Sequence, residues 1–513
     1  MKSDGRGRKF LLGLALFYGV VFGGRSAWRS WMGGASLSAS KAEFLHDEIV
    51  SFELRARDPA LVSRWKARPP RAAVLYNGRR VETIGGLIEA PLRLDAGSGS
   101  FRGGWPCPWN APAGEYALEL VGGGELGSRV TAGKFRIGRR RPIPIPEGYA
   151  VLTWESMASF REMKVRSPDG TLKDWKGLLD WVEYAGADAF WILAGETPGE
   201  GADEVWVSTN FAVIPEMGRE CRRRGLQFGV YAKAYLTASS ARRLARYEYA
   251  VEVSEGVPEK TRAISLRDEN RIRDVAALLK RFARIPEVDF VGLDYIRNAL
   301  GGCELAEDFY AEMPGVSPPP DWGRLSVSEK MVYFARKKGM RRDLPFVDAW
   351  QWWRAHAVGR IIRNIKAEVG AKPLWAFTLT WDKGWHHGQD PVMFNDAGVD
   401  IDALMMYEAD EDQFRMILKD WGSYVRRGDA QLMVGDIVDW PLHQRDPSGP
   451  AALRRRTLEA AKRVFGDGRA QGIFIHDLAR ALDGRLGKWD TRAWMDQARA
   501  AILEHKRLAG AGR

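Results

Sequence analysis

The stretch Val288-Asp-Phe-Val-Gly-Leu-Asp-Tyr-Ile-Arg297 decides how the rest of the chain is interpreted. Its first half is an apolar run with little alternation, which is typical of a parallel strand buried on both faces. Polar side chains come together where the run ends, at Asp294, Tyr295 and Arg297. A strand end of this kind holds a carboxylate rigidly, although an Asp in such a position also caps turns. Features elsewhere in the chain decide whether Asp294 belongs to a functional site or caps a turn.

Strand-like runs of the same kind recur through the last two thirds of the chain, and segments with helical periodicity separate them. The runs cover 150–154, 187–193, 226–231, 289–294, 374–381, 401–407, 431–438 and 472–476. The helical segments cover 172–184, 211–224, 271–284, 350–369, 412–425, 451–465 and 491–508. This alternation predicts parallel pairing with right-handed crossovers. Eight repeats over residues 149–513 therefore predict a closed (β/α)8 TIM barrel.

The chain before residue 149 has a different pattern. Short alternating runs at 49–54, 73–76 and 116–121 lie between turn signals, which predicts an all-β sandwich resembling an immunoglobulin domain over residues 40–138. Trp105 and Trp109 could stack on sugar rings, but packing inside the protein is the favoured interpretation. Residues 139–148 contain alternating prolines and are expected to form a stiff linker.

The N-terminal residues resemble a secretory signal. Lys2, Arg6, Arg8 and Lys9 precede an apolar run of 15 residues from Phe10. The run is short for a membrane-spanning helix, which needs about 20 residues. No clean small-residue cleavage site follows it, so residues 1–39 are expected to be either a cleaved signal peptide or an N-terminal membrane anchor. We expect an exported protein that is periplasmic, secreted or anchored in the inner membrane.

Composition limits the partners. The 513 residues carry a net charge of +11, which suits a nucleic acid, an anionic envelope or an acidic polysaccharide. The basic residues are spread along the chain without a basic-aromatic motif, so no nucleic acid partner is expected, and a generally arginine-rich composition is the favoured explanation of the charge. The 3 cysteines form no recognisable pair pattern and do not indicate a redox compartment.

The residues at the ends of the predicted strands are mostly acidic and aromatic. Besides the three already named, they are Trp154, Glu155, Glu196, Trp381, Asp382, Trp385, Tyr407, Glu408, Asp436, His476 and Asp477. In a closed barrel all these ends surround one mouth. Carboxylates for proton transfer and aromatic faces for stacking are what glycosidic cleavage requires. No Gly-rich phosphate loop follows the last two strands, which argues against a nucleotide substrate, and no cofactor or metal is expected.

Several segments resemble bacterial families of hypothetical glycosyl-hydrolase TIM barrels. These segments are residues 264–275, the D-Y-I-R stretch ending at Arg297, Gln389-Asp390, Gly398-Val-Asp400 and Ala403-Leu-Met-Met-Tyr407. The resemblance covers roughly residues 150–480 and implies a TIM-barrel glycosidase acting on a polysaccharide or oligosaccharide. It departs from the family at Asn298-Ala299, where Tyr-Pro is usual, and this leaves the sugar open.

The resemblance also implies roles for residues. Asp294 would be the nucleophile or catalytic base, and Arg297 would keep it ionised by lowering its pKa. Glu408 is the first candidate for the general acid, with Asp382 and Glu196 as rivals. The remaining strand-end residues would bind the substrate, with tryptophan and tyrosine rings as sugar platforms.

Two other classes of protein stay open. A metal-dependent deacetylase could use His386, His387, Asp382 and Asp390, which lie in one loop, although adjacent histidines point in different directions. A non-catalytic polysaccharide-binding envelope protein would need no catalytic residues, and the number of carboxylates at the strand ends argues against it.

Overall fold

The computed structural model describes residues 34–86, 88–109, 111–121, 130–198, 204–237, 243–298, 301–339, 343–380, 387–406, 411–424, 430–438, 449–464, 471–483 and 489–510. The chain divides into two compact units. The first comprises Met1–Phe44 and Glu48–Gly138, and the second comprises Leu45–Asp47 and Arg139–Arg513. No helix within the described ranges combines the length and the apolar character that a membrane crossing requires.

The first unit contains two β-sheets that share one hydrophobic core. One sheet has the order β10 (Val130–Ala132), β1 (Ala35–Ala39), β3 (Ile49–Ala56), β8 (Phe101–Pro106) and β7 (Arg93–Leu94). The other contains β2 (Glu43–Phe44), β11 (Lys134–Ile137), β9 (Gly114–Val121), β4 (Arg71–Tyr76), β5 (Arg79–Arg80) and β6 (Ala90–Pro91). A short helix, α2 (Pro59–Ala67), follows β3.

Aromatic residues fill the core of this unit. Trp105 of one sheet lies 6.1 Å from Phe135 of the other, measured between ring centroids, and Tyr116 stacks on Phe135 at 5.6 Å. Trp105 is therefore a packing residue, because only 2% of it is exposed. The immunoglobulin-like topology of this unit stays a prediction.

The second unit is built on a closed barrel of eight parallel strands, and this prediction is confirmed. The strands are β12 (Tyr149–Trp154), β15 (Ala189–Thr197), β16 (Gln227–Thr237), β19 (Phe290–Asp294), β20 (Leu374–Leu379), β21 (Ile401–Met405), β22 (Leu432–Ile437) and β23 (Gly472–His476). They pair in chain order, and β12 pairs with both β15 and β23, which closes the barrel.

Large and small residues alternate across neighbouring strands inside the barrel. Gly229 is the register partner of Trp191, and Gly292 is the register partner of Trp375. A Cβ atom at Gly292 would lie 2.1 Å from the Trp375 ring, so only glycine leaves room for it. The two indole rings stack with centroids 4.0 Å apart. This aromatic layer closes the barrel interior below the mouth.

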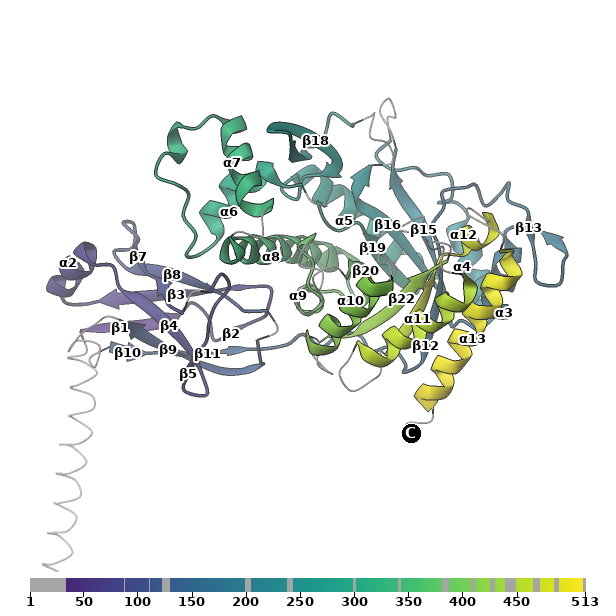
Figure 1. The fold of residues 1–513 in the computed structure, drawn as a ribbon, viewed down its shortest axis with the longest axis horizontal. Coiled ribbons are helices and arrows are strands. Elements are labelled where there is room, and N and C mark those ends of the chain that lie inside the picture. Colours follow the sequence, from purple (N-terminus) through teal and green to yellow (C-terminus); the bar gives the residue numbers. More distant parts are fainter. Residues whose placement is uncertain are drawn as a thin grey trace, which may run out of the picture. The chain divides into compact units, whose positions relative to one another are not determined.

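Helices follow the strands and lie outside the barrel, with α3, α11 and α13 packed side by side (Figure 1). They are α3 (Lys176–Ala185), α4 (Ile214–Arg223), α5 (Glu269–Ala283), α8 (Leu344–Val369), α9 (Pro391–Ala397), α10 (Glu411–Tyr424), α11 (Pro450–Arg463), α12 (Leu478–Asp483) and α13 (Thr491–Gly510). Most carry an apolar face toward the strands.

Additional elements occur in the connections after three of the strands. A hairpin of β17 (Tyr249–Ser254) and β18 (Val257–Ile264) pairs with the long end of β16. After β19 the chain forms η2 (Cys303–Leu305), α6 (Ala306–Glu312), η3 (Trp322–Arg324) and α7 (Val327–Gly339). A small hairpin of β13 (Val165–Arg166) and β14 (Leu172–Lys173) precedes α3. The sequence patterns did not predict these hairpins: β13 and β14 have two residues each, and the centre of β18 is the polar run Glu259–Arg262.

The proline-rich segment is not a free spacer. Arg140 donates from Nη1 to Asp400 at 2.9 Å, and the N–H of Ile143 donates to the same carboxylate at 3.0 Å. Asp400 is fully buried and also accepts from Lys366 at 2.8 Å. This motif aspartate therefore has a structural role at the end of the barrel opposite the mouth, since it precedes β21 rather than following a strand.

Candidate functional site

Alternation along four strands brings polar side chains to the inside of the barrel mouth. Val151, Tyr231, Phe290 and Phe474 belong to the interior core. Successive side chains of a strand point to opposite faces, so every second residue toward the carboxyl end also faces inward. Counting forward from the core in twos leads to Glu155, Lys233, Asp294 and His476, the first of which directly follows β12.

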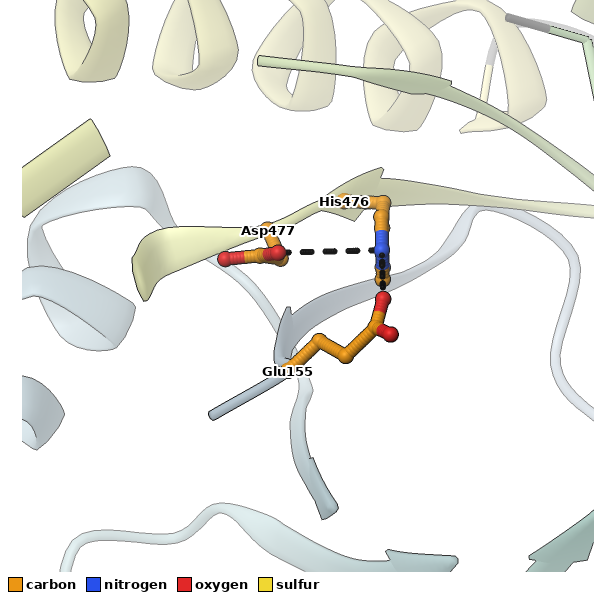
Figure 2. A group of neighbouring side chains, drawn as sticks. All are labelled: Glu155, His476 and Asp477. Atoms are coloured by element: carbon orange, nitrogen blue, oxygen red, sulfur yellow. Dashed lines mark hydrogen bonds and ion pairs between the residues drawn. The ribbon is translucent and has the colours of Figure 1, made fainter. Parts of the chain in front are cut away.

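Glu155 contacts both His476 and Lys233 in this group, and Figure 2 shows its carboxylate pointing toward the ring of His476, which Asp477 also approaches. Its Oε2 lies 2.7 Å from Nε2 of His476, and its Oε1 lies 3.1 Å from Nζ of Lys233. The other ring nitrogen of His476 lies 2.8 Å from the hydroxyl of Thr153. Lys233 also contacts Glu196 at 3.2 Å. One carboxylate is thus held between two cationic side chains at the mouth.

These contacts decide the charge of Glu155. Burial alone would raise its pKa, but the hydrogen bond from His476 and the charges of His476 and Lys233 outweigh burial and lower the pKa to about 2. The pKa of Lys233 is raised: burial opposes this, while Glu155 and Glu196 favour the charged amine. The pKa of His476 is also raised: burial opposes this, but the hydrogen bond to Glu155 and the negative charges of Asp477 and Glu155 together outweigh it. Glu155 is therefore ionised across the physiological pH range.

Asp294 behaves in the opposite way. It is 4% exposed, and its Oδ1 accepts the N–H of Tyr295 at 2.7 Å. Burial, and after it the negative charge of Glu155, raise its pKa to about 7, although Arg297 lowers it. The expectation that Arg297 keeps Asp294 ionised is therefore wrong. Desolvation and a like charge outweigh the neighbouring cation.

Tyr295 and Arg297 lie beside Asp294. Tyr295 adopts the left-handed backbone conformation, with φ of 51°, directly after the strand ends. Its pKa is raised to about 12 by burial and by the charge of Asp294. The guanidinium carbon of Arg297 lies 4.5 Å from the centroid of the Tyr295 ring. This cation–π contact restrains the guanidinium, whose charge acts on Asp294.

A buried arginine supports the Lys233 side of the site. Arg271 of α5 is fully buried and donates to the carbonyl oxygen of Lys233 at 3.0 Å and to that of Ala234. Its guanidinium lies 4.3 Å from the ring of Trp206. Arg271 lies in the segment 264–275 that carries the family resemblance, but no role was predicted for it. An arginine within a helical pattern is normally exposed, so this one had no distinctive signal.

Asp436 and Trp154, which the sequence predicts at the barrel mouth, do not belong to the inward-facing group around Glu155. Asp436 follows the inward-facing Gly435 and points outward, where its Oδ2 lies 3.2 Å from Nε of Arg456 on α11. Trp154 precedes Glu155 and also points outward. Its indole N–H donates to the carbonyl of Ser156 at 3.0 Å, and 4% of the residue is exposed. Neither position offers a side chain to the mouth, because the strand period of two fixes the face.

Five other predicted site residues, Trp381, Asp382, Trp385, Tyr407 and Glu408, lie outside the described residues.

Glu155, His476 and Asp477 offer ligand atoms within 4.8 Å of one another and could surround a metal ion. One feature opposes this use. The amine of Lys233 already occupies a position 3.1 Å from Glu155. Asp390 of the alternative metal loop caps α9 by accepting the N–H of Met393 at 2.8 Å.

No protein-family model matches the chain, and no curated protein matches its sequence. Solved structures with a related fold include an exo-β-1,4-mannosidase from an Opitutaceae bacterium, at 11% identity and a TM-score of 0.38 over 72% of this chain and 62% of that chain. A GH42 β-galactosidase from G. stearothermophilus matches at 10% identity and a TM-score of 0.45, over 72% of this chain and 58% of that chain. The chain thus spans less than two thirds of either protein. At such identities and TM-scores neither likeness bears on the activity of this chain.

Proposed function

We propose that the protein is a glycoside hydrolase that cleaves O-glycosidic bonds of a polysaccharide or oligosaccharide with Asp294 and Glu155 as its two carboxyl groups. The main support is that their pKa values are shifted in opposite directions, to about 7 for Asp294 and about 2 for Glu155. A pair of this kind supplies a proton donor and an ionised partner at the same pH.

In this mechanism Asp294 gives its proton to the glycosidic oxygen as the bond to the leaving sugar breaks. Glu155 acts at the anomeric carbon, where positive charge develops. It either attacks this carbon as the nucleophile or takes a proton from the water molecule that attacks it. Lys233 and His476 keep Glu155 ionised and fix its orientation. The sequence predicts Asp294 as the nucleophile or catalytic base, whereas its raised pKa favours it as the acid. Glu408 as general acid stays a prediction.

We also propose that the protein is exported. The basic residues and the apolar run at residues 2–24 support this, and a polysaccharide of the cell envelope or the environment would then be within reach.

The test is the release of reducing sugar from a panel of polysaccharides and aryl glycosides. Glu155→Gln and Asp294→Asn should each lower turnover by about 1,000-fold or more. Asp436→Asn is the matched control, since this buried carboxyl at the same end of the barrel faces outward, and turnover per folded molecule should be unchanged. If Glu155→Gln and Asp294→Asn retained wild-type turnover, the assignment of the site would be wrong.

A metal-dependent deacetylase is the second candidate, supported by the spacing of Glu155, His476 and Asp477. It predicts stoichiometric metal in the purified protein, loss of activity on chelation, and release of acetate rather than reducing sugar. A non-catalytic binding protein would retain polysaccharides without releasing either product.

A further inference from the structure

We propose that Arg297 binds a carboxylate of the substrate, so that the barrel acts on glycans containing uronic acid residues. This inference rests on the proposed glycosidase function and specifies its substrate.

The first observation is the environment of the guanidinium. Arg297 is 8% exposed, and among the described residues its buried Nη1 has no hydrogen-bond acceptor. It forms no ion pair with any carboxylate in the described part of the chain, and its close contact is the ring of Tyr295 at 4.5 Å. Removing a guanidinium N–H from water without an acceptor is costly, so a site of this kind is suited to an acceptor that arrives from outside.

Other buried arginines of the barrel unit are held differently. Arg271 donates to the carbonyl of Lys233 at 3.0 Å, Arg354 to the side-chain oxygen of Asn298 at 3.0 Å, and Arg456 to the carbonyl of Met406 at 3.1 Å. Each of these three links parts of the fold. Arg297 has no comparable hydrogen bond within the described residues, so the described part of the fold does not account for its buried Nη1.

The second observation is the distribution of cations around the reacting groups. Lys233 lies between Glu155 and Glu196, at 3.1 Å and 3.2 Å, so its charge already has partners. Among the described residues, Arg297 is a cation near Asp294 that has no ion-pair partner of its own. A planar guanidinium restrained against an aromatic ring matches a planar carboxylate with two parallel hydrogen bonds. The net charge of +11 favours the approach of an acidic polysaccharide.

Binding of this kind would also assist Asp294. The positive charge of Arg297 lowers the pKa of Asp294 in the free protein. A substrate carboxylate on Arg297 would neutralise that charge, so Asp294 would keep its proton to higher pH once an acidic substrate is bound. A neutral sugar would not have this effect.

The test compares uronic acid trisaccharides with their neutral counterparts, using calorimetry for binding and reducing-sugar release for turnover by the full chain. The wild type should bind at least one acidic trisaccharide about 10- to 100-fold more tightly than its neutral partner. Arg297→Gln should remove this preference and leave the affinity for the neutral sugar within about threefold. Arg297→Lys should recover only part of it, because lysine keeps the charge but not the paired donors. The pH dependence of kcat should shift upward for the acidic substrate in the wild type and not in Arg297→Gln.

Several results would overturn the inference. One is equal affinity of the wild type for acidic and neutral sugars. Another is a higher affinity for a sulfated sugar than for a uronic acid sugar. The third is an equal loss of affinity for the acidic and the neutral sugar in a folded Arg297→Gln protein. If that variant does not fold, the wild-type preference decides alone. Selective binding of the acidic sugar without hydrolysis would retain the role of Arg297 and refute the proposed catalytic function, so the two failures are distinguishable.

Discussion

Asp294→Asn is expected to make the protein more stable while making it inactive. The asparagine keeps the shape of the side chain and an oxygen that can accept the N–H of Tyr295, which Asp294 now accepts at 2.7 Å. It removes the group whose proton is needed at the glycosidic oxygen. The same change removes a buried carboxyl that loses its proton in an unfavourable environment.

The sign and size follow from the pKa. In the folded protein the pKa of Asp294 is about 7, above the usual value of 3.8. Between these values the native state holds a proton that the unfolded chain releases, so this group's contribution to stability falls as pH rises and levels off above pH 7. The shift corresponds to about 2–4 kcal/mol of unfolding free energy lost by the wild type between acidic pH and pH 8. The asparagine variant does not have this loss.

Thermal unfolding at pH 5 and pH 8 measures the effect. The difference in Tm between variant and wild type should be larger at pH 8 by about 3 °C, because about 2–3 kcal/mol of the loss falls between these pH values. Asp169→Asn is the control: hydrogen bonds from Thr171 lower the pKa of this exposed carboxyl, so it is ionised in both states at both pH values, and its Tm difference should be the same at pH 5 and pH 8. A Tm difference that is the same at both pH values, or that is smaller at pH 8, would refute the assignment of a raised pKa to Asp294.

Three further predictions test the charge network, the barrel core and the N-terminus. Lys233→Met removes the cation 3.1 Å from Glu155, so the pKa of Glu155 should rise. We expect kcat/KM to fall by about 100-fold or more, most strongly at acidic pH. Lys173→Met, which removes one side of an exposed ion pair, should leave kcat/KM unchanged. Gly292→Ala would place a Cβ atom 2.1 Å from a barrel tryptophan and should lower the unfolding free energy by about 1–3 kcal/mol or more, whereas Gly323→Ala, with no neighbouring atom within 4 Å, should not. A fusion of residues 1–40 to a periplasmic reporter should place the reporter outside the cytoplasm, and its full retention inside would contradict export.

The sequence was sufficient for the barrel because buried parallel strands are apolar on both faces. The runs at 289–294 and 472–476 correspond closely to β19 and β23. The predicted strand ends also place the site residues at the correct edge of the barrel. The strand period of two distinguishes side chains that point into the barrel from those that point outward. Asp436 follows an inward-facing glycine and points toward α11, so the period of two excludes it from the predicted site.

The charge states could not be predicted from the sequence. Arg297 is three residues from Asp294 in the chain, and this proximity alone predicts a lowered pKa for Asp294. The decisive neighbour is Glu155, which lies 139 positions earlier and reaches Asp294 only through closure of the barrel. The contacts of Lys233 with Glu155 and Glu196 likewise connect three different strand ends. Desolvation and long-range contacts depend on the fold, and no local pattern reports them.

The most direct measurement is the pH dependence of kcat/KM for a substrate with a poor leaving group. The general acid must be protonated, so kcat/KM should stay constant from about pH 4 to about pH 6 and fall about tenfold per pH unit above the pKa of Asp294, near pH 7. No acidic limb is expected in that range, because the pKa of Glu155 is about 2. A rate that instead rises through pH 7 would show that Asp294 acts in its ionised form, and it would contradict the assignment of Asp294 as the proton donor and Glu155 as its partner.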